Sequence, residues 1–212
     1  PPLPPHSFFL IITNTVVDVA GDVIVSAGTI AYLGAFSGDY RAALETTWRA
    51  KMVEVQMPHT AGVTMTDTLA NPVVVRDWQL CGLPTDQQST TNGVVMDKGR
   101  RWPLCIDPQM QANRYIKKLS EKFTGNNYSV VKQSNKNLIR TMENGVRFGK
   151  WVLMENVGET LDAALEPILQ RNVFKQGGQD MIRLGAFYNH GNIFFFFFFF
   201  FFLFIFFFFF FF

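Results

Sequence analysis

The sequence predicts an α/β fold of the P-loop NTPase type, in which a parallel sheet is flanked by helices. From Arg101 onward, short apolar segments alternate with segments of helical period, which is typical of parallel strands joined by helices. Trp151–Met154 is apolar throughout, as expected of a strand covered on both faces. The polar pair Glu155-Asn156 follows this strand directly, at the sheet edge where α/β proteins bind ligands.

The segment before this alternation is predicted to be mainly helical. Apolar and small residues recur at helical spacing in Gly21–Gly34. A second helix is predicted to follow, with Asp39 as its N-cap. Met57–Thr68 has turn residues and no period, so it is predicted to be a connection. The β-branched run in Asn71–Leu80 (NPVVVRDWQL) predicts a strand or an extended segment.

The elements of the alternating part have their own boundary signals. Asp107 suits an N-cap and Pro108 the first helical position, and Gly125 ends that helix. Gly149 ends the next helix, and Gly177-Gly178 is predicted to form the turn of a hairpin. The predicted strands are Trp102–Ile106, Tyr128–Lys132 and Trp151–Met154, the predicted helices lie near 112–119, 138–146 and 167–171, and the hairpin covers Val173–Leu184.

The two ends differ in composition from the rest. Seventeen of the 24 phenylalanines lie in Phe194–Phe212, and without this run the apolar fraction falls from 48% to roughly 43%, which is ordinary for a soluble domain. The run reads like a translated pyrimidine tract, and so does PPLPPHSFFLII at the start. We therefore expect residues 1–15 to be unstructured read-through, residues 16–185 to form the module, and residues 186–212 to be an aberrant tail.

Charge and cysteine content argue against several classes of function. The 19 Lys and Arg residues are balanced by 17 Asp and Glu residues and are scattered, so we expect no nucleic-acid or anionic-lipid partner. Cys81 and Cys105 form no CxxC pair, and the three histidines are isolated. The sequence predicts no metal site and two free thiols, as in a reducing compartment.

The first candidate binding residues lie in the loop after the predicted strand Asn71–Leu80. Over this loop (GLPTDQQS), the phosphate-binding pattern G-x-x-x-x-G-K-[ST] places Gly82 on the first glycine and Ser89 on the hydroxyl. Gln87 and Gln88 replace the second glycine and the lysine, which removes backbone freedom and the cation that reaches the phosphates. An ordinary Gly-Pro turn is the competing interpretation.

The segment WVLMEN, Trp151 to Asn156, supplies the second part of the candidate site. Four apolar residues followed by two polar ones resemble the Walker B strand of an ATPase, which normally ends in Asp and Glu, for the metal and for the attacking water. Glu155 and Asn156 take these places. Because an amide cannot accept the proton of the water, the sequence predicts a degenerate nucleotide site without catalytic residues. A buried strand with a polar end is the competing interpretation.

Several blocks are specific enough to indicate a family. The most specific are RWPLCIDPQ, which begins at Arg101, and ENVGE, which begins at Glu155. Together with the other blocks they resemble the fifth AAA+ module of dynein heavy chains, and AYLGAF, which begins at Ala31, is more similar to axonemal than to cytoplasmic dyneins. The blocks span about 165 residues in collinear order: Val19–Phe36, Thr68–Asp86, Asn92–Asn113, Leu138–Leu169 and Phe174–Gly185.

The resemblance implies an AAA+ large subdomain, incomplete at its C-terminus, in the ring of six modules of a minus-end-directed microtubule motor. In that family this module follows the stalk, carries the buttress and does not hydrolyse ATP, so its role is mechanical. It needs no cofactor of its own, whereas the parent motor is an ATPase that uses ATP and Mg²⁺. The implied partners are the neighbouring AAA+ modules, the stalk and buttress of the same chain, microtubules, and dynein intermediate and light chains. The implied location is the cytoplasm, the cytoskeleton and the axoneme of a cilium or flagellum.

Two other functions remain as alternatives. One is an active or nucleotide-binding P-loop ATPase module, because Gly82 and Ser89 are present. The other is a protein anchored in a membrane by the phenylalanine run, which reaches the roughly 20 residues of a span. ATP turnover that Glu155→Gln abolishes would favour the first alternative, and carbonate-resistant membrane association would favour the second.

Overall fold

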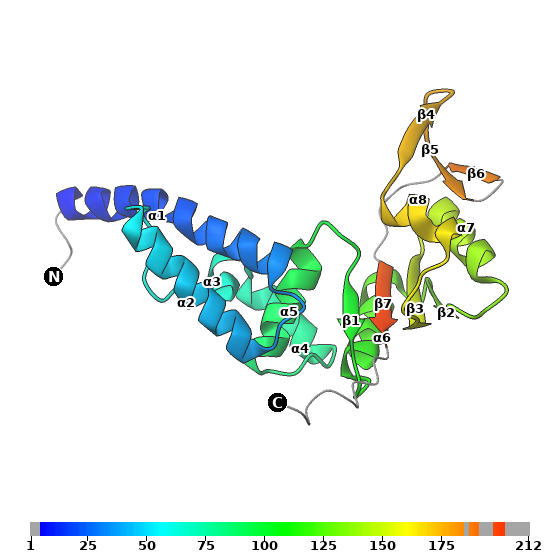
Figure 1. The fold of residues 1–212 in the computed structure, drawn as a ribbon, viewed down its shortest axis with the longest axis horizontal. Coiled ribbons are helices and arrows are strands. Elements are labelled where there is room, and N and C mark those ends of the chain that lie inside the picture. Colours follow the sequence, from blue (N-terminus) through cyan, green and yellow to red (C-terminus); the bar gives the residue numbers. More distant parts are fainter. Residues whose placement is uncertain (1–4, 185–186, 191–196, 202–212) are drawn as a thin grey trace, which may run out of the picture. The chain divides into compact units, whose positions relative to one another are not determined.

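The computed structural model describes residues 5–184, 187–190 and 197–201 (Figure 1). The chain divides into two compact units, which are described separately. The first comprises Pro1–Gln79 and Pro84–Gly99, and the second comprises Leu80–Leu83 and Arg100–Phe212. Among the described residues, no helix has both the length and the apolar character that crossing a membrane requires.

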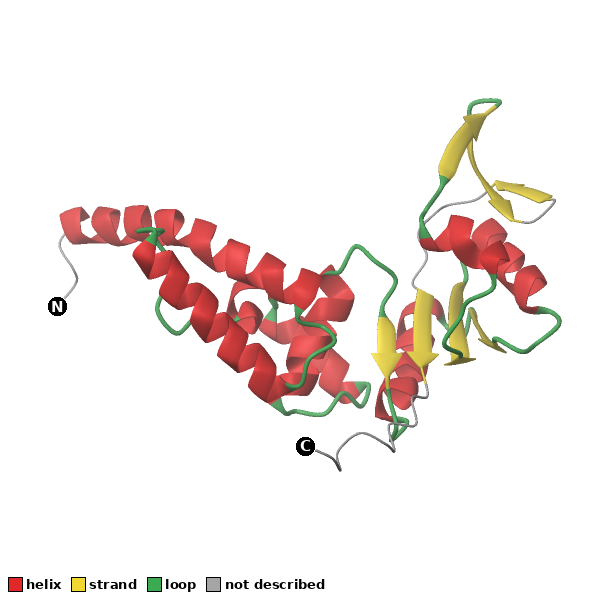
Figure 2. Cartoon of the chain, viewed as in Figure 1, coloured by secondary structure: helices red, strands yellow, loops and turns green. Residues whose placement is uncertain are grey.

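The first unit is helical (Figure 2). Its long helix α1 packs against α2 and α3, and the helix predicted over Gly21–Gly34 is the C-terminal part of α1. The last residue of α4, Leu80, is assigned to the second unit. The helices are α1 (Pro5–Tyr32), α2 (Gly38–Glu54), α3 (Met65–Leu69), α4 (Pro72–Leu80) and α5 (Gln87–Lys98).

The turn between α1 and α2 is held by the guanidinium group of Arg41. This group is buried and donates hydrogen bonds to the backbone oxygens of Gly34 and Phe36 and to Oδ1 of Asn92. Burial lowers the pKa of Arg41, and the nearby carboxylate of Glu45 opposes this effect. Because the guanidinium satisfies carbonyl groups beyond the end of α1, it fixes the direction in which α2 starts.

The prediction of a strand or an extended segment over Asn71–Leu80 is wrong, because Pro72–Leu80 forms helix α4. The Oδ1 atom of Asn71 accepts a hydrogen bond from the backbone N–H of Val73, and proline is favourable in the first helical turn. Trp78 is buried on one side of this helix. Local capping and the burial of one face therefore outweigh the strand preference of three consecutive valines.

Three smaller expectations also need correction. Met57–Thr68 is not only a connection, because α3 begins in it behind a capping box between Thr64 and Asp67. Helix α1 begins at Pro5, so residues 5–15 are helical instead of unstructured. Asp39 lies in the first turn of α2, whose N-cap is Ser37.

The second unit contains a four-stranded parallel sheet with strand order β1-β7-β3-β2. This confirms the predicted α/β class. Strand β7 comes from the phenylalanine run and lies between β1 and β3; the rest of that run lies outside the described residues. The elements are β1 (Leu104–Ile106), α6 (Gln111–Thr124), β2 (Tyr128–Lys132), α7 (Leu138–Phe148), β3 (Trp151–Val157), a 3₁₀ turn (Ala163–Leu165), α8 (Glu166–Leu169) and β7 (Phe197–Phe201).

The core of the second unit is built around β3. Val152, Leu153 and Met154 are each at most 2% exposed, so both faces of this strand are covered, as its apolar run predicts. Helix α7 contacts β2 and β3, and α6 contacts β2. Gly125 and Gly149 end these two helices in the left-handed conformation, as predicted.

The predicted hairpin is also confirmed. Strands β4 (Val173–Gln176) and β5 (Gln179–Leu184) pair antiparallel around Gly177-Gly178. Strand β6 (Phe187–His190) pairs with β5 and completes a small second sheet. Ile182 and Leu184 of β5 belong to the core around β3, so the hairpin is anchored by its second strand.

Candidate functional site

The carboxyl end of β1 leads through the loop Asp107–Met110 into α6. The side chain of Asp107 is buried, and its two carboxylate oxygens accept hydrogen bonds from the backbone N–H groups of Gln111 and Asn113, both at 2.9 Å. The N-terminus of a helix offers such N–H groups to bound anions. Here a carboxylate of the chain itself occupies them, although the helix starts at Gln111 and not at Pro108 as predicted.

This loop lacks the groups with which a strand-loop-helix unit binds phosphates. When the lysine position of the phosphate-binding pattern is placed at the start of α6, Cys105 and Met110 fall on the two glycines, Gln111 on the lysine and Ala112 on the hydroxyl. Met110 has a φ of 59°, in the left-handed region where glycine fits without steric cost. The loop keeps a bend of the backbone, but it has neither the cation nor the hydroxyl that would hold a nucleotide and its Mg²⁺.

Glu155 lies at the carboxyl end of β3 and faces α6. Its Oε1 atom accepts a hydrogen bond from Nδ2 of Asn113 at 2.8 Å and forms an ion pair with Nζ of Lys117 at 2.7 Å. The Glu155 side chain is 15% exposed. Glu155, the first polar residue after the apolar run of β3, is therefore joined to α6 by Asn113 and Lys117.

Opposing influences act on the pKa of Glu155. Burial, the largest single influence, favours the neutral acid, whereas the hydrogen bonds from Asn113 and Lys117 and the charges of Lys117 and Lys132 favour the carboxylate. Their combined effect outweighs burial, and the pKa of Glu155 lies below its ordinary value. The ion pair thus contributes stability above the pKa of an unfolded glutamate, and this contribution is lost as the pH falls through the lowered pKa.

This linkage predicts the behaviour of Glu155→Gln. The variant should be less stable than the parent chain near neutral pH, and the difference should shrink as the pH falls below about 4.3, the ordinary glutamate pKa. Urea unfolding midpoints of both chains at a series of pH values measure this difference. A difference that stays constant down to the lowest pH would contradict the assignment of the ion pair.

Asn156 follows Glu155 and is exposed to solvent. Its backbone is in the left-handed region, with a φ of 55°. The loop after β3 is held by Gln133, whose Oε1 accepts a hydrogen bond from the N–H of Gly158 and whose Nε2 donates one to the backbone oxygen of Thr160, both at 2.6 Å. Asparagine adopts the left-handed conformation more readily than most residues. Asn156 therefore carries a side chain suited to this turn.

The segment Gly82–Ser89 follows helix α4 and runs into the first turn of helix α5. Gln87, Gln88 and Ser89 form the first turn of α5 in the first unit, and the carboxylate of Asp86 accepts a hydrogen bond from the N–H of Ser89 at 2.8 Å. Gly82 belongs to the second unit, as do Glu155 and Asn156. Because a phosphate loop follows a strand, the interpretation of Gly82–Ser89 as such a loop loses its structural basis.

Sequence reasoning missed the residues around β1 and α6. The elements themselves were predicted, with Asp107 between them, but the loop contains no glycine or lysine that would match the phosphate-binding pattern. Topology could have found it, since this is the first place in the chain where a strand of the parallel sheet leads into a helix. Asn113 and Lys117, which contact Glu155, carry no motif of their own.

Neither cysteine takes part in a disulfide. Burial, and to a smaller extent the charge of Asp107, raises the pKa of Cys105 in β1 to about 12, so its thiol is protonated at neutral pH. Within the described part of the chain, no three His, Cys, Asp or Glu side chains are grouped in a way that could hold a metal ion.

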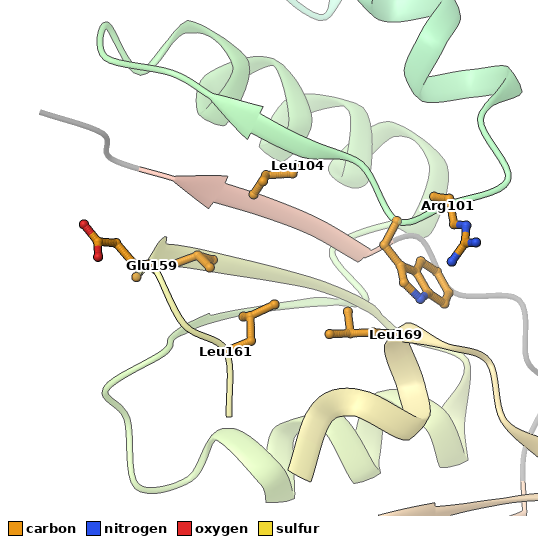
Figure 3. A pocket seen from close by; sticks show the side chains of 8 residues that line it. Arg101, Leu104, Glu159, Leu161 and Leu169 are labelled. Carbon is orange, nitrogen blue, oxygen red and sulfur yellow. The ribbon is translucent and has the colours of Figure 1, made fainter. Parts of the chain in front are cut away.

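A cavity of about 360 Å³ lies in the second unit. Figure 3 shows Arg101 and Glu159 at opposite ends of it, with Leu104, Leu161 and Leu169 between them. The described residues that line it include neither Asp107 nor Glu155. The cavity is thus mainly apolar and distinct from the polar contacts between α6 and β3.

The parallel sheet and the helices that flank it define an α/β domain. A family model described as the ATP-binding dynein motor region matches residues 76–199. This match covers more than half of the chain, and the chain belongs to this family.

Curated relatives identify the kind of dynein. The chain is 48% identical over 172 residues to dynein axonemal heavy chain 1 of Rattus norvegicus, which covers 81% of this chain and 4% of the relative. It is 45% identical over 168 residues to dynein axonemal heavy chain 3 of Mus musculus (79% and 4%), and 40% identical over 166 residues to the dynein-1-beta heavy chain of the flagellar inner arm I1 complex of Chlamydomonas reinhardtii (78% and 4%). The chain is therefore part of the motor region of an axonemal dynein heavy chain and spans about one twenty-fifth of the length of these relatives.

Proposed function

We propose that this chain is a non-catalytic AAA+ module of an axonemal dynein heavy chain, in the fifth position of the motor ring. The observation that carries the proposal is the hydrogen bonding of Asp107 at the start of α6. Its carboxylate engages the N–H groups that would meet a phosphate, and its negative charge would repel one. The loop supplies no lysine to compensate, because Gln111 occupies that position.

The end of β3 supports the same proposal. Oε1 of Glu155 already accepts hydrogen bonds from Asn113 and Lys117, so this oxygen is less available to a metal ion. Asn156 offers an amide where a base would have to accept the proton of the attacking water. Hydrolysis would therefore lack both the phosphate-binding loop and the base.

A module of this kind acts mechanically. In the proposed ring it passes on rearrangements that ATP and Mg²⁺ drive at other modules of the same heavy chain. Its partners are the neighbouring AAA+ modules, the stalk and the buttress; the parent motor acts on microtubules together with dynein intermediate and light chains in the axoneme of a cilium. The fifth position rests on the sequence resemblance, and an electron-microscopy map of the intact motor can test it by locating α6 and α7 in the module that follows the stalk.

Phosphate release by the purified chain tests the lack of catalysis. We expect no turnover of Mg-ATP above the rate without protein, and none after Asn156→Glu, because Asp107 still occupies the N–H groups at the start of α6. Turnover by the unchanged chain would refute the proposal, and turnover by Asn156→Glu alone would show that Asp107 does not keep the nucleotide out. Binding of a fluorescent ATP analogue without turnover would leave the module non-catalytic but would show that the carboxylate yields its place to a nucleotide.

A further inference from the structure

Helix α8 ends with an arginine in a backbone conformation that glycine usually adopts. Arg171 has a φ of 53°, in the left-handed region. The N–H of Asn172 donates a hydrogen bond to the backbone oxygen of Pro167 at 2.9 Å, and the N–H of Arg171 donates one to that of Ile168 at 3.0 Å. This pair of bonds is the Schellman motif, which normally has glycine at the position of Arg171. A long side chain at a position with a backbone cost points to a role for that side chain.

The guanidinium group of Arg171 lies over the indole ring of Trp102. Its Cζ atom is 4.4 Å from the centroid of the ring, within the range of a cation–π interaction. The indole N–H donates a hydrogen bond to the backbone oxygen of Ile168 at 3.0 Å, and the ring packs against the core around β3. The end of α8 therefore holds Trp102 both by its face and by its N–H. We call Trp102, Ile168 and Arg171 the Trp102 latch.

The Trp102 latch lies at the base of the β4–β5 hairpin. Strand β4 begins at Val173, two residues after Arg171 (Figure 1). All four residues of β4 are exposed, whereas Ile182 and Leu184 of β5 belong to the core. Burial of side chains thus fixes β5 but not β4. The direction of the hairpin then depends on what holds the chain just before β4.

We propose that Arg171 is a positioning residue that holds Trp102 and thereby fixes the direction of the β4–β5 hairpin relative to the segment that leads into β1. Trp102 lies two residues before β1 and two residues after Arg100, where the chain passes from the first unit into the second. The latch joins this segment to the end of α8 across 66 positions of sequence. A movement of the segment is thus passed on to the hairpin. The proposal does not depend on the absence of catalysis.

Replacing Arg171 by lysine or by glutamine tests the proposal in the 212-residue chain. Both variants keep a long side chain and the same backbone cost, but only lysine keeps the positive charge. Native-state hydrogen exchange measures how often β4 opens. We expect the N–H groups of β4 to exchange about fivefold faster or more in Arg171→Gln, and the increase in Arg171→Lys to be smaller. Equal exchange in the two variants, whether raised or not, would overturn the proposal.

The indole of Trp102 gives a second readout. In a chain labelled with 5-fluorotryptophan, each of the four tryptophans gives a fluorine NMR signal, and Trp102→Phe identifies the signal of Trp102. Arg171→Gln should shift this signal, because the charge over the ring is lost. Trp102→Phe, which removes the N–H donor to Ile168, should also accelerate exchange in β4. An unchanged Trp102 signal in Arg171→Gln, or unchanged exchange in Trp102→Phe, would refute the latch.

Lys150→Gln is the matched control. The Nζ atom of Lys150 lies 5.9 Å from the centroid of the Phe148 ring, in the same unit but away from the Trp102 latch. We expect exchange in β4 to stay within about twofold of the parent chain in this variant. If Lys150→Gln accelerates exchange in β4 as much as Arg171→Gln does, the contact between Arg171 and Trp102 does not position the hairpin.

Discussion

Asp107→Ala should destabilise the second unit by about 2 kcal/mol, because two N–H groups at the start of α6 lose their acceptor. Asp107 is 6% exposed, so water replaces its oxygens poorly. The N–H groups of Gln111 and Asn113 would both be affected. Urea unfolding gives the total loss, and hydrogen exchange should show the largest loss of protection in the first turn of α6.

Asp107→Asn is the matched control. Its amide keeps one acceptor oxygen of nearly the same shape, so we expect a loss smaller than that of the alanine variant. If alanine and asparagine cost the same, or if hydrogen exchange in α6 does not change, the carboxylate does not cap this helix. Comparing the two variants also tests the proposed function, because that proposal depends on the hydrogen bonds from the N–H groups of Gln111 and Asn113 to Asp107.

Gly21→Ala should destabilise the first unit by about 3 kcal/mol, since the new methyl group has no space. A Cβ atom at this position would lie 2.2 Å from the backbone oxygen of Pro58 and 2.8 Å from Cβ of His59. These atoms precede Thr60, whose N–H is bonded to Asp22, so the segment cannot move away without loss of that hydrogen bond. Urea unfolding followed by far-UV circular dichroism measures the effect.

The sign of this change makes the test specific. In an unobstructed helix, alanine is more favourable than glycine by about 1 kcal/mol, so a helix without a neighbour at this position would be stabilised. Gly34→Ala, in the turn after α1, is the control for an added methyl group without a clash, because a Cβ there meets no atom within 4 Å, and we expect it to cost much less than Gly21→Ala. A neutral or stabilising Gly21→Ala would show that the connection 58–60 does not press against α1.

Much of the second unit follows from local sequence signals. Gly125 and Gly149 end helices in the left-handed conformation, and the hairpin turns at Gly177-Gly178. These signals depend on the backbone preferences of one or two residues and do not depend on distant parts of the chain. The apolar run before Glu155 likewise predicts a strand that is covered on both faces, and the core confirms it.

Other features depend on packing or on residues far apart in the chain. The valines of α4 prefer a strand locally, yet the cap at Asn71 and the burial of Trp78 make them helical. Because the sequence predicted a strand over Asn71–Leu80, the loop after it, Gly82–Ser89, was interpreted as the phosphate-binding loop. The residues that hold Glu155 were missed for a related reason, since Asn113 lies 42 positions away in sequence and has no motif.

The sequence by itself determined the α/β class, most of the strands and helices after Arg101, and membership among axonemal dynein heavy chains. It could do so because hydrophobic periodicity, capping residues and the blocks that resemble the family each depend on residues that are close together in the sequence. Only the tertiary structure decided that Asp107 occupies the start of α6, that Glu155 is paired with Lys117, and that Asp22, Ser26 and Thr29 of α1 are buried. Each of these depends on which surfaces meet after folding, because burial and partner choice are properties of packing and not of local sequence.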